Sequence, residues 1–211
     1  MNKALAQEIR RETQNGPVRI RSFCSADEIK HYRFDAQFGI HAQYKSLYTK
    51  RESLEQNAQQ PDTNVTLALS GGDIIIGFGV LAYPDSNERW AQLQPRIMME
   101  VKAIEVSRQW RAFRLGNGIL EMLLGHPGVE GKIVYMVGYS WTWDLDGTKK
   151  TAQQYRRMLI KLFEALGFLE YQTNEPNICL KPENLFMGRV GKNVDDRTQN
   201  EFKWLRFGMT P

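Results

Sequence analysis

Apolar and polar positions recur along the chain with two different periods, and the helical period appears first. Residues 26–37 and 45–57 are both predicted as helices. The first segment follows Ser25 and carries Asp27 and Glu28 in its first turn, where negative charge stabilises the positive end of a helix dipole. Helices are therefore expected ahead of the first long apolar strands.

The strand period dominates the middle of the chain. Residues 65–69 and 74–81 are apolar runs on either side of a Ser-Gly-Gly-Asp turn, which predicts a β-hairpin. Residues 97–106 form a long strand candidate, and 132–138 is a short apolar run bounded by glycines, typical of a buried strand. A Gly-bearing segment lies between these two strands, and residues 119–124 in it have the apolar density of a helix.

The helical period returns in the last third, where residues 151–166 are predicted as a helix that ends at Gly167. Residues 168–171 and 185–190 are expected as closing strands, and 195–206 as a final amphipathic helix. The inward-facing positions expected for these two helices are Tyr155, Met158, Leu159, Leu162, Phe163, Leu166, Phe202 and Leu205.

This order predicts a mixed α/β fold with a strand–turn–helix–strand unit in its middle. One domain is expected over residues 1–211, because this length matches a single globular core. Residues 1–16 are expected to be poorly ordered, and residues 195–211 form a C-terminal helix and tail.

Composition narrows the function classes. The chain is 42% hydrophobic and 25% charged, as a folded protein with a large core is, which excludes a disordered or collagen-like chain. No apolar run approaches the roughly 20 residues of a membrane helix. The net charge is +4 with scattered Lys and Arg, whereas a nucleic-acid-binding protein is expected to carry a basic stripe. A mildly basic surface suits anionic cofactors such as nucleotides.

Cysteine and histidine usage predicts a reduced, metal-free protein. Cys24 and Cys179 have neither CxxC nor metal-ligand spacing, and the N-terminus carries charges where a signal peptide needs an apolar stretch. Cytoplasmic localisation is the expectation. His31, His41 and His126 form no spaced set, so no metal site is expected.

The most informative segment runs from Ile104 to Leu120. A strand leads into a turn, and the turn opens a helix that contains Gly116 and Gly118. A helix N-terminus offers unpaired N–H groups and partial positive charge, and glycine lets the backbone approach a ligand, so this arrangement predicts a pyrophosphate cradle. Nearby arginines add positive charge. The alternative is an ordinary helix start whose glycines permit close helix–sheet packing, and neither GxGxxG nor the P-loop sequence is present.

These residues resemble the cofactor motif of the GNAT acetyltransferase superfamily, in which a strand is followed by R/Q-x-x-G-x-G/A. Arg114 stands where the motif has its middle glycine, and a side chain there either crowds or clamps a phosphate. The resemblance implies acetyl-CoA as the cosubstrate. It implies contacts to acetyl-CoA from Ile104, Val106, Arg111, Ala112, Phe113, Arg114, Leu115, Gly116, Asn117 and Gly118.

Three further motifs, at residues 141–150, 174–178 and 187–194, resemble the acetoin-utilisation acetyltransferases (AcuA), a bacterial GNAT family. The likeness covers residues 74–207. It implies a GNAT-like domain with a central, mostly antiparallel twisted sheet that splays at the acetyl-CoA site and is flanked by helices. It also implies direct transfer, within a ternary complex, of an acetyl group to a lysine of acetyl-CoA synthetase, which inactivates the synthetase and restrains acetate activation.

The resemblance also assigns catalytic roles. A backbone N–H at the end of the long strand, near Val106, would polarise the thioester carbonyl, and Glu105 is the nearest candidate for the base that deprotonates the amine. Glu105 is equally read as a solvated carboxylate at a strand end. Glu100, on the other face of the strand, is a weaker candidate.

The general acid of many GNAT enzymes is a tyrosine, but Phe163 occupies the matching position here. Tyr155 and Tyr139 are the substitute candidates, with a core or substrate-wall role as the alternative for each. A third possibility is that no acid is needed, because a CoA thiolate is a tolerable leaving group.

Trp141, Trp143 and Asp144 lie in the loop where an acceptor is expected to enter, so they are the candidate substrate-binding residues. Two tryptophans in a loop either anchor a protein partner or pack as a small core. Two other functions stay open at this point: acetylation of a small amine, and a CoA-binding regulatory module without catalysis.

Overall fold

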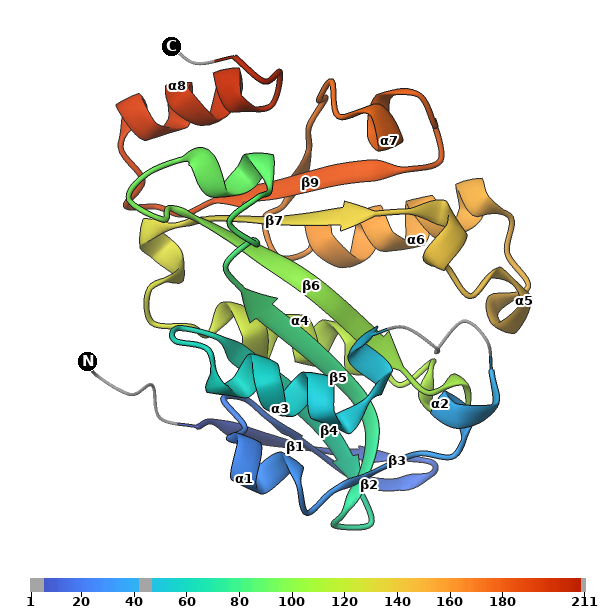
Figure 1. Ribbon diagram of the computed structural model, residues 1–211. Helices are drawn as coiled ribbons and strands as arrows, with labels where there is room; N and C mark the ends of the chain where they lie inside the picture. The colour runs from blue at the N-terminus through green and yellow to red at the C-terminus, as the bar shows by residue number, and fades with distance from the viewer. Residues whose placement is uncertain (1–5, 42–46, 210–211) are drawn as a thin grey trace. The chain divides into compact units, whose positions relative to one another are not determined.

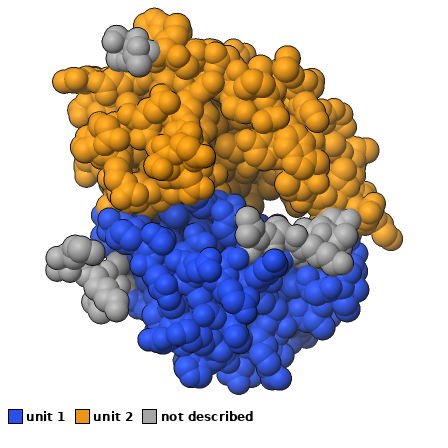
Figure 2. Space-filling view, in the orientation of Figure 1, with its two compact units in different colours: residues 1–82, 102–127 blue, residues 83–101, 128–211 orange. Residues whose placement is uncertain are grey.

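The computed structural model describes residues 6–41 and 47–209. Its contacts divide the chain into two compact units, coloured separately in Figure 2. Unit 1 comprises Met1–Ala82 and Lys102–Pro127, and unit 2 comprises Tyr83–Val101 and Gly128–Pro211. Strand β6, Met98–Val106, contributes its first residues to unit 2 and its last five to unit 1.

Unit 1 is built on an antiparallel sheet with the strand order β1-β2-β4-β5, and the end of β6 lies beside β5 (Figure 1). Its strands are β1 (Glu8–Thr13), β2 (Gly16–Arg21), β4 (Asn64–Ser70) and β5 (Ile74–Ala82), with a short β3 (Arg33–Phe34) that pairs with β5 in parallel. The predicted hairpin, now β4 and β5, is confirmed. The segment expected to be poorly ordered instead supplies β1, while residues 1–5 lie outside the described part of the chain.

The two helices predicted over residues 26–37 and 45–57 are shorter in the structure, whereas the helix predicted over 119–124 begins earlier, at Leu115. The helices of unit 1 are α1 (Ala26–Ile29), α2 (Gln37–Ile40), α3 (Arg51–Gln59) and α4 (Leu115–Leu124). The predicted helix over 26–37 is wrong beyond α1, because the chain then extends and pairs with the start of β5, and Arg33 N–H donates to Asp73 O at 2.9 Å. The second predicted helix begins only at Arg51, after the 3-10 helix Leu47–Thr49. Residues 45 and 46 of that prediction lie outside the described residues.

Alternation along β5 separates the two faces of this sheet. Phe78 and Val80 point to the core formed with α1 and α3. Gly79 faces α4, and a Cβ there would lie 2.6 Å from Ile119 Cγ2, so only glycine permits this close approach. Helices α1 and α3 therefore cover one face of the sheet and α4 covers the other.

Unit 2 contains the start of β6, β7 (Ile133–Gly138), β9 (Leu185–Val190) and β8 (Leu169–Glu170). β6 and β7 are parallel, as a strand–helix–strand crossover requires, and the β7–β9 and β9–β8 pairs are antiparallel. The helices are α5 (Leu145–Thr148), α6 (Ala152–Glu164), α7 (Pro176–Cys179) and α8 (Asp196–Leu205). The 3-10 helices of the two units are Arg89–Gln92, Arg108–Trp110, Val129–Gly131 and Ser140–Thr142, besides the one already given.

The core of unit 2 is aromatic. Trp90 stacks on Phe186 with ring centroids 4.5 Å apart, and Tyr135 stacks on the same phenylalanine at 5.6 Å. Phe202 and Leu205 of α8 are buried, as predicted. The mixed α/β class, the strands β6 and β7 and the helices α6 and α8 are confirmed.

Helix α6 departs from its predicted face at Met158, in the middle of the helix. Phe163 is buried, whereas Met158 is 36% exposed rather than inward-facing. Gly167 has φ +84°, the left-handed conformation expected of the residue that ends this helix. The predicted strand 168–171 is reduced to Leu169–Glu170.

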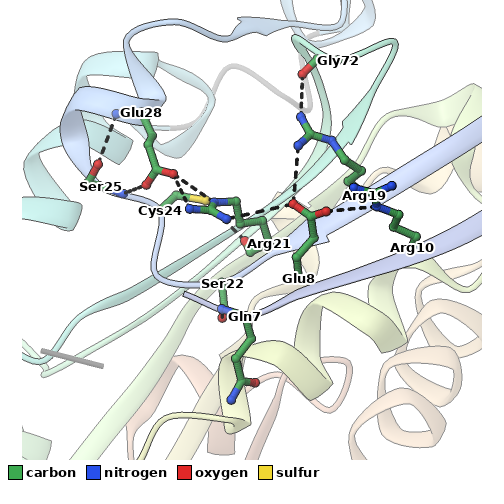
Figure 3. A network of polar contacts seen from close by, with 10 residues as sticks. All are labelled: Gln7, Glu8, Arg10, Arg19, Arg21, Ser22, Cys24, Ser25, Glu28 and Gly72. Carbon is green, nitrogen blue, oxygen red and sulfur yellow. Dashed lines mark hydrogen bonds and ion pairs between the residues drawn. The ribbon is translucent and has the colours of Figure 1, made fainter. Parts of the chain in front are cut away.

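A polar network ties β1, β2 and α1 together in unit 1 (Figure 3). Arg21 donates to Glu28 Oε1 from Nε at 2.9 Å and from Nη2 at 2.6 Å. Glu28 and Ser25 form a reciprocal capping box at the start of α1. Glu8 accepts hydrogen bonds from the guanidinium groups of Arg10 and Arg19. The Arg21–Glu28 pair therefore links strand β2 to the helix that covers the sheet.

Stability at low pH is expected to depend on Glu28. Burial by itself raises the pKa of this carboxyl, but hydrogen bonds from Ser25 and the Arg21 guanidinium outweigh it and lower the pKa below the ordinary 4.5. The stabilisation is present above the unfolded-state pKa and is lost as pH falls through the folded-state pKa. Urea midpoints between about pH 7 and about pH 3 should fall less steeply for Glu28→Gln, which keeps the capping box but carries no charge.

Asp27→Asn is the matched control on the same helix, because Asp27 is an exposed carboxylate that pairs with the exposed Lys30. Its acid dependence should follow that of the unmodified protein. Identical acid profiles for Glu28→Gln and the unmodified protein would refute the assignment.

Candidate functional site: a helix N-terminus behind strand β6

The turn after β6 adopts two unusual backbone conformations. Phe113 N–H donates to Arg111 O at 2.9 Å across Ala112, whose φ is +77°, which makes a tight γ-turn. Arg114 follows with φ +54° and ψ +29°, the left-handed region, and forms the N-cap of α4. Such residues cost about 1–3 kcal/mol each and tend to gather at functional sites.

The conformation of Arg114 explains its place in the motif. A left-handed residue favours glycine, which is the residue that the motif has at this position. Arginine here accepts the strain and adds a charged, exposed side chain at the helix start. Arg114 therefore differs from the motif glycine only in its side chain, because its backbone has the left-handed conformation that glycine favours.

The N-terminus of α4 has no side-chain cap. In an α-helix the first N–H groups lack intrahelical acceptors, and here these belong to Leu115, Gly116 and Asn117. Gly118 is the first to bond within the motif, donating to Arg114 O at 3.2 Å. Uncapped donors at the positive end of a helix dipole form a site that attracts phosphate or another anion.

Side chains from the start of the chain support this turn. Arg11 of β1 donates from Nη1 to Arg114 O at 3.1 Å and pairs with Glu121 of α4 at 3.3 Å. Asn15 Nδ2 donates to Gln109 O at 3.0 Å. Neither residue was singled out from the sequence, because contacts about a hundred positions apart leave no local pattern.

The two glycines of the motif differ in what surrounds them. A Cβ on Gly118 would lie 2.6 Å from Ile20 Cδ1 and 3.0 Å from the Arg11 guanidinium carbon, and Gly118 is buried. Gly118 therefore faces the sheet, which agrees with the alternative that this glycine permits close helix–sheet packing. Gly116 is partly exposed in the first turn, where its N–H is one of the uncapped donors.

Ile104, Glu105 and Val106 are half-buried at the end of β6, and the 3-10 helix Arg108–Trp110 separates them from this turn. Arg111 Nε donates to Val106 O at 3.1 Å, which draws the start of the cradle back to the strand. Unit 1 thus brings Glu105, Val106 and the segment from Arg111 to Gly118 together.

The remaining candidates lie in unit 2 and form two aromatic stacks. Tyr139 and Trp141 stack with centroids 4.7 Å apart, and Lys181 Nζ lies 4.8 Å from the Trp141 ring. Trp143 stacks on Tyr155 at 5.1 Å. Trp141 is 55% exposed, which suits contact with a partner protein. Trp143 is 8% exposed, which suits packing in a small core.

Asp144 and the tyrosines have identifiable surroundings. Asp144 is 3% exposed and caps α5, accepting from Gly147 N–H at 3.0 Å. Burial raises the pKa of the Tyr139 phenol to about 12, with smaller contributions from Glu175, Glu100 and Glu88, so this hydroxyl keeps its proton at neutral pH. Phe163 packs edge-on against Phe168 in the core.

The two cysteines offer no activated nucleophile in the described structure. Burial, and then Glu28, raise the pKa of the Cys24 thiol to about 12, which opposes thiolate formation. Cys179 is exposed at the end of α7. Within residues 6–41 and 47–209, no three His, Cys, Asp or Glu side chains gather as a metal site would require. None of the helices in that same part of the chain has the length and apolarity needed to cross a membrane.

Known proteins resemble this chain over almost its whole length, although no protein-family model matches it. The acetoin utilization protein AcuA of Bacillus subtilis (strain 168) is 31% identical over 196 residues, which are 93% of this chain and 91% of that protein. The crystal structure of an acetoin utilization protein from Exiguobacterium sibiricum is 27% identical, with a TM-score of 0.89 over 98% of this chain and 96% of the other. The GNAT domain of PAT from S. lividans has a TM-score of 0.54 at 12% identity, over 86% and 95% of the two chains, and shows the fold alone.

The fold is of the GNAT type, and with the near full-length relatives it defines the class: the chain is an acetyl-CoA-dependent N-acetyltransferase of that type. Within that class, the identity over nearly the full length of both proteins shows that the chain belongs to the acetoin utilization protein AcuA family.

The packing role of Gly118 is testable by substitution. Gly118→Ala should lower the free energy of unfolding by about 1–3 kcal/mol, because the added methyl group overlaps Ile20 and Arg11. Gly39→Ala is the control in unit 1, since a Cβ at Gly39 meets no atom within 4 Å. Urea unfolding measures both variants, and equal stability of the two would contradict the packing interpretation.

Proposed function

We propose that this protein transfers the acetyl group of acetyl-CoA to a lysine side chain of acetyl-CoA synthetase, and that the transfer lowers the activity of the synthetase. The uncapped N-terminus of α4, in the turn between β6 and α4 that contains two residues of positive φ, is the observation that carries the proposal. Membership of the AcuA family supports a role in acetoin and acetate metabolism.

The cradle would anchor the pyrophosphate of acetyl-CoA. We assign this role to the backbone from Arg111 to Gly118, with the first-turn N–H groups as donors. The Arg114 side chain adds charge at the helix start, and Gly118 contributes by letting α4 approach the sheet. Ile104 and Val106, at the end of β6, would line the path of the pantetheine arm.

The reaction requires one new bond and one broken bond. The lysine nitrogen attacks the thioester carbon, the carbon–sulfur bond breaks, and the amine proton leaves to a base. We assign the base role to Glu105 and carbonyl polarisation to the backbone N–H of Val106, because both lie at the end of β6 beside the cradle. Both residues also make other contacts in the structure.

The leaving thiolate takes up a proton directly from water or from a tyrosine. Tyr139 remains protonated at neutral pH, which a general acid must do, and its ring is held by the stack on Trp141. Tyr155 is held against Trp143 in the same way and is the second candidate.

The loop of Trp141, Trp143 and Asp144 would receive the acceptor protein. Trp141 is the member of this set that solvent reaches, so we assign it the contact with the acceptor. Asp144 caps α5 and Trp143 packs on Tyr155, and these two residues would hold the loop in place.

The reaction and the acceptor are tested together by intact-mass measurement of acetyl-CoA synthetase after incubation with acetyl-CoA, with and without this protein. A single acetyl increment that requires this protein and accompanies loss of synthetase activity is expected. Trp141→Ala should lower kcat/KM for the synthetase by about tenfold, since truncating an aromatic anchor commonly costs more than 1 kcal/mol, and should leave the KM for acetyl-CoA unchanged.

Two results would contradict this proposal. Acetylation of small amines without any acetylation of the synthetase would assign a different acceptor. Binding of acetyl-CoA without transfer to any amine would remove the transfer step itself.

The assignment of the base is tested with a matched pair of variants. Glu105→Gln should lower kcat by about 100-fold and leave the KM for acetyl-CoA unchanged, because only deprotonation of the amine is affected. Glu100→Gln is the counterpart, since Glu100 lies on the same strand at a position of opposite parity. A loss confined to Glu100→Gln would transfer the role to Glu100 and overturn the assignment.

A further inference from the structure

Two other strands, β3 and β6, lie along the same edge of strand β5. β4 pairs with Ile74 and Ile75 on one edge, so β3, which pairs with the same two residues, must occupy the opposite edge, where β6 also lies. Asp35 N–H, just after β3, donates to Ile75 O at 2.9 Å, and Ser107 N–H, just after β6, donates to Ile76 O at 2.8 Å. β3 and the end of β6 therefore meet at consecutive residues of β5.

A β-bulge makes this meeting possible. The β4–β5 register passes from Ala68 opposite Gly77 to Leu69 opposite Ile75, which leaves Ile76 as the extra residue. Consecutive carbonyls of a regular strand point to opposite edges, whereas a bulge permits two of them to serve the same edge. Since β3 already occupies the next position, β6 cannot continue along β5 and the chain must leave the sheet at Ser107.

A side-chain network holds this point of departure. Ser107 is fully buried, and its single hydroxyl proton is shared between two acceptors, Asp35 Oδ1 at 2.9 Å and Gln37 Oε1 at 2.8 Å. Gln109 donates from its backbone N–H to Gln37 Oε1 at 3.1 Å and from Nε2 to Asp35 Oδ2 at 3.1 Å. Gln37 N–H in turn donates to Asp35 Oδ1 at 3.0 Å.

The network lies at the base of the cradle. Trp110 N–H donates to Ser107 O at 2.9 Å, so the 3-10 helix that leads to Arg111 starts from the fixed residue. None of these side chains has a role in the chemistry assigned above. They connect Asp35 and Gln37, near the start of the chain, to Ser107 and Gln109, from which the turn begins.

We propose that Ser107, Asp35 and Gln109 are positioning residues that fix where and in which direction the chain leaves β6, and thereby orient the first N–H groups of α4 toward the pyrophosphate. The identity of the ligand rests on the proposed function, whereas the positioning itself does not. The network acts through the backbone of the cradle and touches neither acetyl-CoA nor the acceptor.

Ser107→Ala is the direct test, with Ser22→Ala as its matched control. Ser22 is also fully buried and its hydroxyl accepts from Gln7 N–H at 3.2 Å, away from the cradle (Figure 3). In the ligand-free protein, amide hydrogen exchange over residues 108–118 should accelerate in Ser107→Ala and stay unchanged in Ser22→Ala. The Kd for CoA, measured by calorimetry, should rise by about tenfold in Ser107→Ala alone, as loss of a hydrogen bond to a charged group implies.

The outcomes separate this inference from the proposed function. Unchanged exchange over residues 108–118 in Ser107→Ala overturns the positioning role, whatever the protein binds. Accelerated exchange in a protein whose unmodified form binds no CoA supports the positioning role and refutes the proposed ligand. If Ser107→Ala does not fold, Gln109→Leu replaces it, because Gln109 is exposed and the variant loses only the amide bond to Asp35. A smaller acceleration is expected there, and none would overturn the inference.

Discussion

Each edge of a strand has a single row of backbone donors and acceptors. In unit 1, β3 and the end of β6 both bond to the row on one edge of β5. β3 takes the positions at Ile74 and Ile75, and the last hydrogen bond of β6 falls at Ile76. Because β3 already occupies the next positions along β5, the chain turns away from the sheet at Ser107, shortly before the segment from Arg111 to Gly118. The place of the cradle is thus set by which backbone groups of β5 are already used.

The helix that follows compensates for an unfavourable start. Two left-handed residues and two glycines, each glycine costing about 1 kcal/mol in a helix, oppose α4. Its side chains Leu115, Ile119, Leu120, Met122 and Leu123 are buried, and each buried side chain of this size contributes about 1.5–3 kcal/mol. Packing against the sheet therefore holds the helix in place while its N-terminus stays uncapped. A side-chain cap would stabilise the helix but would occupy the donors that an anion needs.

Much of the fold could be predicted because it is encoded locally. The apolar runs of β4 and β5 and the helical period in α6 and α8 each reflect burial within a single element. The predicted helix over 26–37 failed because Arg33 and Phe34 gain more from pairing with a distant strand than from continuing a helix. Propensity within a short window contains no information about that partner.

The candidate site likewise contains residues that the sequence could predict and residues that it could not. The segment from Arg111 to Gly118 was visible as a motif, and its backbone shape agrees with what the motif requires. The supporting residues Arg11, Asn15 and Asp35 were not visible, because polar residues on exposed strands and loops are ordinary in any sequence. Asp144 illustrates the reverse case, since a carboxylate that looked available for substrate is engaged as a helix cap.

The supporting contacts also bear on the order in which the protein folds. The contacts that hold the cradle join residues 70, 72, 94 and 103 positions apart in the sequence. Closing such long loops is slow and entropically costly, so these contacts form only after the strands that carry them have assembled. A growing chain that has already produced the whole motif still lacks a formed cradle until its first forty or so residues have docked on the sheet. Formation of the cradle is therefore expected late in folding, and it depends on residues far from the motif in the sequence.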